Sequence, residues 1–318
     1  MYNKVQNTFE SVCLGREITY YVYRPVDEKG DLSEVKAVVQ LSHGMNEYVE
    51  KYEDFARFLT DQGIVFCGGD HLGHGATGEK YDECGFFAKR HGYRYVVEDV
   101  YQLTQRMKKE YGDIPFFLFG HSMGSFIARA YLMKYSNELS GCMISGTGGG
   151  NPMSIFGIAL SDIIARIKGP KYVSMMLENL AFSDYNKGFD VVYGNEWLTR
   201  DTEICAIRAR DQRTKFSFCA SAYRDLMTWL TIANTQKAVK LVDKNMPILF
   251  ISGDADPVGN YGVGVRKVYE KFQKLGQEDV TLKLYHGARH ELLNEINRDE
   301  VKEYILLWME RVAKLSMQ

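Results

Sequence analysis

Short apolar runs alternate with longer amphipathic stretches along most of this chain, and this alternation restricts the fold more than any other feature of the sequence. The central runs are apolar at nearly every position, which is typical of parallel strands covered on both faces. Seven runs are short enough to be strands: 18–25, 37–44, 64–70, 114–120, 141–146, 247–253 and 280–285.

Between these runs, apolar residues recur at the spacing of an amphipathic helix. Tyr48, Tyr52, Phe55 and Leu59 follow this spacing, and Gly63 is a typical C-terminal stop. Strands that alternate with helices predict an α/β protein with a mostly parallel, doubly wound sheet. Similar patterns predict helices over 93–112, 125–136, 261–276 and 298–315.

One long segment interrupts the alternation. Over 148–241 no run predicts a parallel strand, whereas 155–167 and 172–182 have helical patterns. A helical insertion between two strands of the sheet explains both observations. We therefore expect 1–147 and 242–318 to form one α/β domain, with 148–241 as a helical cap.

Composition and charge exclude several classes of protein. With 45% hydrophobic and 25% charged residues, the chain is neither disordered nor fibrous. Its net charge of -2 creates no field that attracts nucleic acid, so no nucleic-acid partner is expected. No signal-peptide pattern and no run of about 18 apolar residues occurs, so we expect no membrane span and a cytoplasmic location.

The cysteines indicate neither disulfides nor a metal site. Three of the six lie in or beside apolar runs, which favours reduced thiols in the core. No spacing of Cys and His is typical of a zinc site, and we expect no metal and no cofactor. No pattern indicates an oligomeric state. The six are Cys13, Cys67, Cys84, Cys142, Cys205 and Cys219.

The stretch FGHSMGS at 119–125 lies between an apolar run and a predicted helix. Its central part, from Gly120 to Gly124, fits the pattern G-x-S-x-G. In that pattern the glycines leave room for a serine in a strained turn, with its hydroxyl exposed above the sheet. A serine in an ordinary glycine-rich turn would need neither the strand nor the helix. The context therefore favours Ser122 as a nucleophile.

A serine nucleophile requires a histidine base and an orienting carboxylate, in the chain order Ser, Asp or Glu, His. Asp254 and Asp256 follow one predicted strand, and His286 and His290 follow the next. Spacing does not choose within either pair, and a solvated turn aspartate or a surface histidine is the alternative for each residue. Because both types occur in the required order, the sequence predicts a triad.

Catalysis by such a triad also needs an oxyanion hole of backbone N–H groups. Met123 follows the proposed nucleophile at the start of a predicted helix, and its N–H is one candidate. The second is the N–H of Met45, which follows His43 and Gly44 in an HG-type motif directly after a predicted strand. A plain strand-to-helix turn is the alternative for His43 and Gly44, but the location favours function.

Together these motifs resemble those of the α/β-hydrolase superfamily, and within it the monoglyceride lipase and lysophospholipase-like serine hydrolases, which are sometimes grouped with the serine aminopeptidases. The resemblance implies an eight-stranded α/β-hydrolase sheet with an inserted helical cap. It also implies cofactor-independent hydrolysis of a small-molecule acyl ester, such as a monoacylglycerol or a lysophospholipid, through an acyl-enzyme. The matching stretches are 41–78, GHSMG at 120–124, SGDADPVG at 252–259 and YHGARHELLNE at 285–295.

The resemblance also implies a role for each residue. It selects Asp256, in a G-x-x-D arrangement, as the acid with Asp254 in reserve, and it selects His290, which precedes ELLNE, as the base. Ser122 would attack the ester carbonyl, His290 would carry the proton and Asp256 would hold the imidazolium. Three residues of the second matching block are implied to support the site: Asp70, His71 and His74.

The cap is expected to decide the substrate. Its methionines can adapt to varied acyl chains, although packing of the cap onto the sheet competes with this interpretation. Transient contact of the cap with lipid is also expected. The predicted pocket combines residues from both parts of the chain: His43, Gly44, His121, Met153, Phe156, Met175 and Met176.

Seven charged cap residues alternate in sign, which predicts a solvated helix face rather than a phosphate-binding patch. Their mixed charge does not single out an acidic cluster for a substrate ammonium, so an aminopeptidase remains an alternative rather than the leading hypothesis. A non-catalytic ligand-binding homologue is disfavoured because every triad residue is present. The charged residues are Arg200, Asp201, Glu203, Arg208, Arg210, Asp211 and Arg213.

Overall fold

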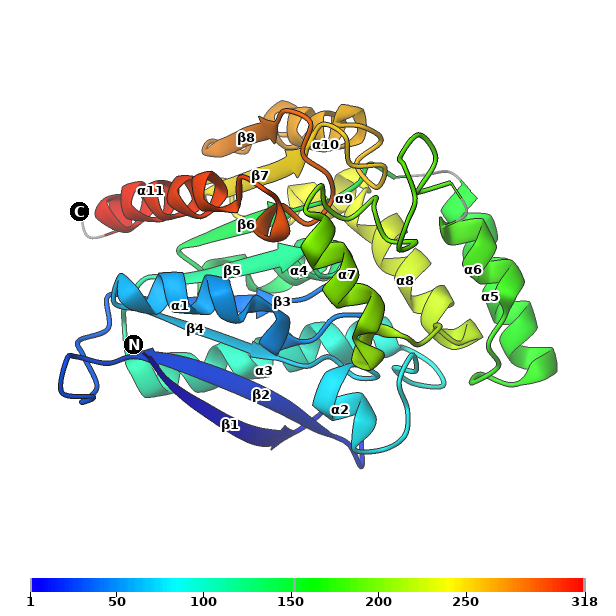
Figure 1. The fold of residues 1–318 in the computed structure, drawn as a ribbon, viewed down its shortest axis with the longest axis horizontal. Helices are drawn as coiled ribbons and strands as arrows, with labels where there is room; N and C mark the ends of the chain where they lie inside the picture. Colours follow the sequence, from blue (N-terminus) through cyan, green and yellow to red (C-terminus); the bar gives the residue numbers. More distant parts are fainter. Residues whose placement is uncertain (1, 151–152, 183, 317–318) are drawn as a thin grey trace.

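The sheet is the centre of the fold in a computed structural model that describes residues 2–150, 153–182 and 184–316. Its eight strands lie in the order β1-β2-β4-β3-β5-β6-β7-β8 (Figure 1). The β1–β2 and β2–β4 pairs are antiparallel and the other pairs are parallel. This confirms the predicted mostly parallel, eight-stranded sheet. The strands are β1 (Tyr2–Glu10), β2 (Glu17–Pro25), β3 (Ala37–Ser42), β4 (Ile64–Gly69), β5 (Phe116–His121), β6 (Gly141–Ser145), β7 (Ile248–Gly253) and β8 (Val280–Tyr285).

β1 is the strand that no residue pattern predicted. It lies at the edge of the sheet, and Phe9 is its one buried side chain. An edge strand is held by backbone hydrogen bonds to a single neighbour and needs no apolar face. The eighth strand was therefore implied by the resemblance but was invisible in the hydrophobic pattern.

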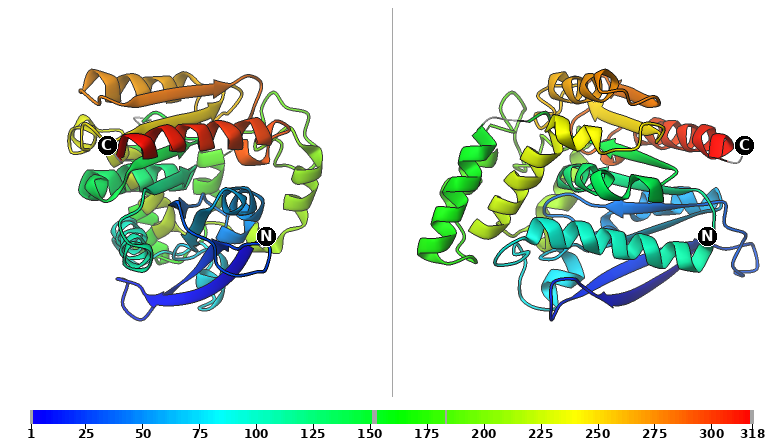
Figure 2. Two further views of the ribbon diagram at one scale, coloured as in Figure 1. Left: turned by 90° about the vertical axis from the view of Figure 1, so that its left-hand side faces the viewer. Right: turned by 180° about the vertical axis from the view of Figure 1, so that it is seen from behind.

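Helices cover both faces of the sheet, as the doubly wound prediction required. α1 and α11 pack on one face, whereas α3, α4, α8 and α10 pack on the other. Figure 2 shows these layers from the side and from behind. The helices are α1 (Glu53–Asp61), α2 (Gly75–Glu79), α3 (Gly92–Tyr111), α4 (Met123–Tyr135), α5 (Met153–Lys168), α6 (Met175–Phe182), α7 (Thr202–Arg210), α8 (Ala220–Ala233), α9 (Gln236–Lys240), α10 (Val263–Lys274) and α11 (Arg298–Ser316).

The carboxyl ends of the parallel strands meet at one edge of the sheet, which is where ligands bind in open α/β proteins. The last residue of β5, His121, is opposite Ser145, which ends β6. In the same way Gly253 ends β7 opposite Tyr285 of β8. The loops that leave this edge carry the predicted nucleophile, acid and base.

Between β6 and β7 the described residues form α5 to α9. α8 packs into the core beside α3 and α4, whereas α5 and α6 form the end of the molecule opposite the two chain termini (Figures 1 and 2). The division into a catalytic domain and a cap at 147/148 and 241/242 stays a prediction.

The six cysteines are free thiols, as predicted, and four of them are buried. Cys84 is exposed and Cys13 is partly buried. Within the part of the chain that the structure describes, no helix combines the length and the apolar character needed to cross a bilayer.

Candidate active site

Ser122 occupies a sharp turn between β5 and α4. Its φ of 53° and ψ of -121° form a strained combination for a residue with a side chain. A Cβ on Gly124 would lie 1.8 Å from the carbonyl oxygen of Ser42, and one on Gly120 would lie 2.7 Å from Cβ of Ala128. Both glycines are therefore required by the close packing of α4 on the sheet, and the turn brings Ser122 to the wall of a cavity.

His290 and Asp256 lie together in the loops that follow β8 and β7. Nδ1–H of His290 donates to Oδ2 of Asp256 at 2.9 Å, and both side chains are buried. Asp256 also accepts from the N–H of Val258 at 2.9 Å, which fixes the carboxylate. Nε2 of His290 is buried and has no hydrogen-bond partner among the described residues. This nitrogen is therefore free to accept a proton at the cavity that His290 and Ser122 both line.

A second Asp–His pair lies close by but in solvent. Nδ1 of His286 is 3.0 Å from Oδ2 of Asp254, and the His286 side chain is 100% exposed. The N–H of Gly287 donates to the other oxygen of Asp254 at 2.6 Å. Neither residue of this pair lines the cavity. The fold thus buries Asp256 with His290, which lines the same cavity as Ser122, and leaves the other pair at the surface.

The two predicted oxyanion donors lie beside Ser122. Met45 and Met123 line the same cavity as Ser122. Met123 is the first residue of α4, where N–H groups have no acceptor within the helix. A Cβ on Gly44 would lie only 3.0 Å from Cβ of Ser122, so the loop that carries Met45 passes next to the serine. An oxyanion hole requires this proximity.

Three buried histidines support that loop from behind. Nδ1–H of His43 donates to the carbonyl oxygen of Gly44 at 2.9 Å, and Nε2 accepts from the N–H of His71 at 3.0 Å. These two bonds fix one tautomer of His43. Burial lowers the pKa of His43 to about 4 and that of His74 to about 3, so both are neutral near pH 7. His43 therefore holds the loop. The prediction that His43 and Gly44 line the pocket is wrong, because neither residue lines the cavity.

Asp70 ties the neighbouring loops together. Its carboxylate accepts from the N–H of Val49 and from that of Ala76, each at 2.8 Å. A Cβ on Gly75 would lie 2.2 Å from Oδ2 of Asp70, so the glycine is required for this contact. These contacts are those of a structural residue near the site.

Glu47 and His121 form a buried pair on the cavity wall. Oε2 of Glu47 accepts from the N–H of Gly44 and from the hydroxyl of Tyr52, both at 2.7 Å, and lies 3.3 Å from Nδ1 of His121. Burial opposes a charge on His121, but attraction to Glu47 outweighs it and raises the pKa. Burial would likewise raise the pKa of Glu47, but His121 and Lys51 hold it well below its usual value.

Sequence reasoning assigned no role to Glu47. The signal that could have found it was its place in the HG-type block, three residues after Gly44. A carboxylate at this spacing can accept the N–H of the glycine, as it does here. Glu47 therefore links the loop that carries Met45 to His121, the residue before Ser122.

Glu291, which follows His290, forms a second buried pair. Nη1 of Arg208 in α7 donates to Oε1 of Glu291 at 2.9 Å, and Nζ of Lys51 lies 3.6 Å from the same oxygen. Burial would raise the pKa of Glu291, but Lys51 and Arg208 lower it below its ordinary value. Arg208 and Glu291 both line the cavity.

The prediction of a solvated helix face for the charged residues of segment 200–213 is wrong, because several of them bond to residues outside 148–241. Arg208 is one of them, and its side chain is only 15% exposed. The others bond to a carboxylate, a guanidinium or a hydroxyl of residues far away in the sequence. These bonds are Arg200 to Glu295 (2.8 Å), Arg298 to Asp201 (2.9 Å), Tyr48 to Asp211 (2.9 Å) and Arg213 to Glu50 (2.9 Å).

The cavity has a volume of about 810 Å³ and two kinds of wall. The polar wall contains the two buried ion pairs and Asn46, Trp197 and Thr214. The apolar wall comes mainly from α4, α6 and α8. Its side chains are Met45, Met123, Phe126, Leu180, Ala181, Leu226, Met227, Leu230 and Val258.

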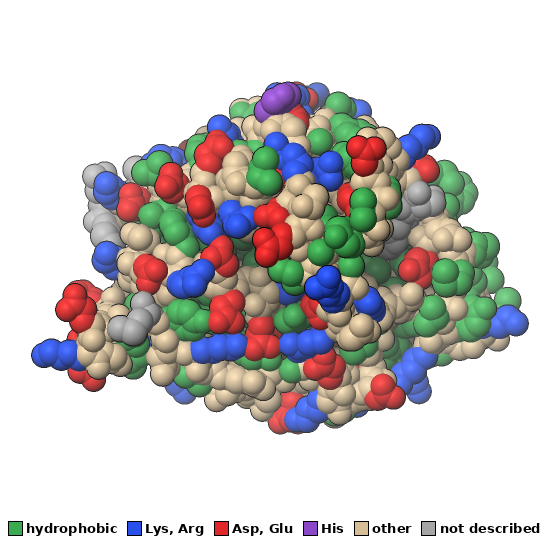
Figure 3. All heavy atoms as spheres, viewed as in Figure 1, with side chains coloured by type: hydrophobic (Ala, Val, Ile, Leu, Met, Phe, Trp, Pro, Cys, Tyr) green, Lys and Arg blue, Asp and Glu red, His purple; other side chains and the backbone are tan. Residues whose placement is uncertain are grey.

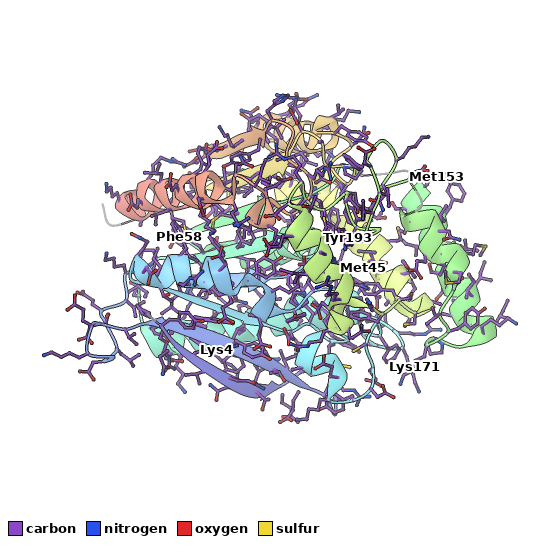
Figure 4. All side chains as sticks on the ribbon, viewed as in Figure 1. Lys4, Met45, Phe58, Met153, Lys171 and Tyr193 are labelled. Atoms are coloured by element: carbon purple, nitrogen blue, oxygen red, sulfur yellow. The ribbon has the colours of Figure 1, made fainter. Side chains whose placement is uncertain are left out.

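The structure corrects the predicted pocket in the cap. His121 lines the cavity, but four cap side chains that were expected there do not. They are 55–67% exposed because α5 and α6 turn this face outward, and Figure 4 shows Met153 far from Met45. Helical spacing identifies an apolar face but not its direction, so Leu180, Leu226 and Leu230 were missed. The four are Met153, Phe156, Met175 and Met176.

The chain matches a known protein family over most of its length. Residues 33–297 match the family described as serine aminopeptidase, S33. A monoacylglycerol lipase of Mycolicibacterium smegmatis is 26% identical over 299 residues, which cover 93% of each chain. A monoglyceride lipase of Homo sapiens is 26% identical over 270 residues, covering 82% of this chain and 77% of that protein.

A solved structure confirms the fold class. The thermostable carboxyl esterase of Bacillus coagulans, in complex with glycerol, superimposes with a TM-score of 0.90 at 26% identity. The match covers 98% of this chain and 100% of that one. The predicted α/β-hydrolase fold is thus confirmed along nearly the whole chain.

Proposed function

We propose, from the premise that this chain belongs to the serine aminopeptidase S33 family, that Ser122, Asp256 and His290 hydrolyse acyl esters through an acyl-enzyme. The chain is a carboxylic-ester hydrolase, a class supported by its lipase relatives and by the esterase neighbour. The observation that carries the mechanism is the unpartnered Nε2 of buried His290 at the cavity of Ser122.

In the proposed reaction, Oγ of Ser122 attacks the ester carbonyl while its proton moves to Nε2 of His290. The N–H groups of Met45 and Met123 stabilise the tetrahedral oxyanion. The imidazolium, held by Asp256, then protonates the departing alcohol, and the acyl group stays on Ser122. Water attacks the acyl-enzyme with His290 again as the base, which releases the carboxylic acid and restores the serine.

The two walls of the cavity favour a monoacylglycerol or a similar single-chain acyl ester. The apolar wall fits an acyl chain, and the polar wall offers hydrogen bonds to a hydroxylated alcohol. The carboxylates of Glu47 and Glu291 are paired with His121 and Arg208. Those of Glu178 and Asp184 also line the cavity, and Oε2 of Glu178 is buried with no hydrogen-bond partner among the described residues. The carboxylates therefore do not separate an ester from a peptide. The ester hypothesis is preferred because two relatives are lipases and a structural neighbour is a carboxyl esterase.

The test is a hydrolysis panel with wild type and Ser122→Ala. It contains p-nitrophenyl esters from acetyl to palmitoyl, a monoacylglycerol, a lysophosphatidylcholine and an aminoacyl-anilide. We expect serine-dependent cleavage of the acyl esters, with a loss of about 10⁶-fold as for removal of the nucleophile of a serine protease. Equal fluorophosphonate labelling of wild type and Ser122→Ala, or cleavage of the anilide alone, would contradict the proposal.

We also propose that α5 and α6, the outer helices of the proposed cap, contact lipid transiently. Hydrophobic side chains gather over the end of the molecule formed by α5 and α6 (Figure 3). Phe156 and Ile167 are 67% and 73% exposed. Burial of such side chains in lipid is favourable by about 25 cal/mol per Å². Cosedimentation with phosphatidylcholine vesicles should weaken for Phe156→Ser and for Ile167→Ser. The control is Leu307→Ser, at an exposed site on α11, which should bind the vesicles as wild type does. Equal binding by all three variants would refute the contact.

A further inference from the structure

The insertion touches the loop of the proposed base directly. The N–H of Glu291 donates to the carbonyl oxygen of Leu198 at 2.7 Å. Nη1 of Arg289 donates to the carbonyl oxygen of Glu196 at 2.6 Å. These bonds fix the insertion against the residues on both sides of His290.

Trp197 lies between the two anchored residues of the insertion. Its ring centroid is 5.0 Å from that of the His290 imidazole, and the two planes are inclined by 37°. The backbone N–H of Trp197 donates to Oδ1 of Asn186 at 3.0 Å, and the ring of Tyr185 packs with its centroid 4.9 Å from the indole. The indole is therefore held in place from the backbone and from its other neighbour.

The rest of His290 is enclosed as well. Its side chain is 1% exposed and donates to Asp256. The ring centroid of His121 lies 4.9 Å away, and a Cβ on Gly146 would lie 3.0 Å from Cε1 of His290. With these neighbours, Nε2 is the polar ring atom left for the reaction.

An aromatic ring within about 6 Å attracts a cation through its quadrupole, and tryptophan does so most strongly. His290 becomes a cation in both halves of the proposed reaction. Trp197 therefore favours the protonated imidazole over the neutral one and keeps water from that side of the ring. Its contribution is larger in the transition state than in the resting enzyme.

We infer that Trp197 is a positioning residue for the hydrolysis, so that the insertion takes part in catalysis besides selecting the substrate. The inference rests on the proposed triad. Trp197 acts through His290, whose orientation and charge it stabilises, and no new bond is formed or broken. The charged and titratable groups facing His290 and its loop stay in place when Trp197 is changed: Asp256, His121 with Glu47, Glu291 with Arg208 and Lys51, Arg289 and Tyr185.

The experiment compares wild type with Trp197→Phe, Trp197→Leu and Ser122→Ala on p-nitrophenyl acetate, a substrate too short to depend on the acyl wall. Tyr193→Leu is the matched control. Tyr193, which is labelled in Figure 4, is an aromatic residue of the same segment. It is 44% exposed and does not line the cavity. Values of kcat and KM are measured across pH. The rate of labelling by a small fluorophosphonate is measured as well, because it reports on Ser122 and His290 and does not depend on binding of an acyl chain. Circular dichroism and thermal melting check folding, and Trp197→Met replaces Trp197→Leu if the latter does not fold.

For Trp197→Leu we expect kcat and the labelling rate to fall roughly 3- to 30-fold with little change in KM. The acid limb of its pH–rate profile should move to lower pH, because the protonated imidazole has lost its aromatic neighbour. Trp197→Phe should retain most of the wild-type kcat, and Tyr193→Leu should have the same kcat and labelling rate as wild type.

Three results would overturn the inference: a lower melting temperature with unchanged kcat and pH profile, a rise in KM alone, or equal losses for Phe and Leu. They would leave the triad intact as long as Ser122→Ala is inactive. If Ser122→Ala keeps its activity, the proposed function fails first and the role of Trp197 fails with it.

Discussion

Asp256–His290 and Asp254–His286 are pairs of the same residue types, from the same two loops, with nitrogen–oxygen distances of 2.9 and 3.0 Å. Their surroundings differ. The first pair is 0% and 1% exposed, whereas the second has a histidine that is 100% exposed. His290 of the first pair lines the cavity of Ser122, whereas neither residue of the second pair does.

The contact itself therefore does not distinguish the pair that we propose as catalytic from the exposed pair. In water an Asp–His contact is screened and worth little. In a dry site the same contact holds the imidazole in one tautomer and orientation, and its electrostatic effect is larger. The neighbours that enclose the first pair and leave Nε2 of His290 without a hydrogen-bond partner among the described residues therefore distinguish it from the exposed pair.

The largest expected effect comes from changing the acids one at a time. Asp256→Asn should lower kcat by about 10⁴-fold, as loss of the triad carboxylate does in serine proteases, because the amide favours the wrong tautomer of the imidazole. Asp254→Asn is the control, and its kcat should equal that of wild type. Steady-state kinetics on p-nitrophenyl butyrate measure both. A large loss for Asp254→Asn would break the comparison.

The second prediction concerns a glycine next to each of the two histidines. Gly146 has a φ of 59°, and an added Cβ would meet the His290 ring at 3.0 Å. Gly146→Ala should therefore displace the imidazole and reduce kcat by about 10²-fold. Gly287, with a φ of 68°, serves the exposed pair. Gly287→Ala carries similar backbone strain and should lower the melting temperature without this loss of kcat; equal losses of kcat would mean that strain alone is responsible.

The third prediction concerns the charge beside His290. Arg208→Met leaves the buried carboxylate of Glu291 with the more distant Lys51 and with the side-chain N–H of Asn294, which donates to Oε2 at 2.7 Å. We expect the free energy of unfolding to fall by about 2 kcal/mol, less than for a fully isolated buried charge because Lys51 remains. Chemical denaturation measures the change. Arg210→Met, on the exposed side of the same helix, is the control, and a matching loss there would show that the pair is not the cause.

The smallest effect is expected at the exposed pair, and it depends on pH. Burial would raise the pKa of Asp254, but the hydrogen bonds from His286 and from the N–H of Gly287 lower it. A lowered folded pKa means that the stabilisation is present above the ordinary value of about 3.9 and is lost as the pH falls through the folded value. Asp254→Asn should cost less than about 1 kcal/mol at pH 7.

That small difference should disappear in denaturation curves recorded as the pH falls through the folded pKa of Asp254, below about 3.9. An Asp254→Asn variant that is much less stable than wild type at pH 7, or a difference that persists once Asp254 is protonated, would contradict the contrast between an exposed and a buried pair.

Much of the fold could be predicted because it depends on local patterns. The helix predicted over 298–315 is observed as Arg298–Ser316, and the strand predicted over 247–253 as Ile248–Gly253. Ser122 was recognisable because a nucleophile elbow needs its glycines at fixed spacing in the chain. β1 was not recognisable, since an exposed edge strand has no apolar pattern to detect.

By itself the sequence determined the alternation of strands and helices, the elbow at Ser122 and two candidate residues each for the acid and the base. The tertiary structure decided which candidates meet, that Arg208 faces Glu291 rather than solvent, and that Trp197 packs against His290. The physical reason is the range of the interactions. Turn geometry and helical periodicity act over a few residues, whereas burial and dielectric surroundings depend on segments such as 196–200 and 289–295, which only the folded chain brings together.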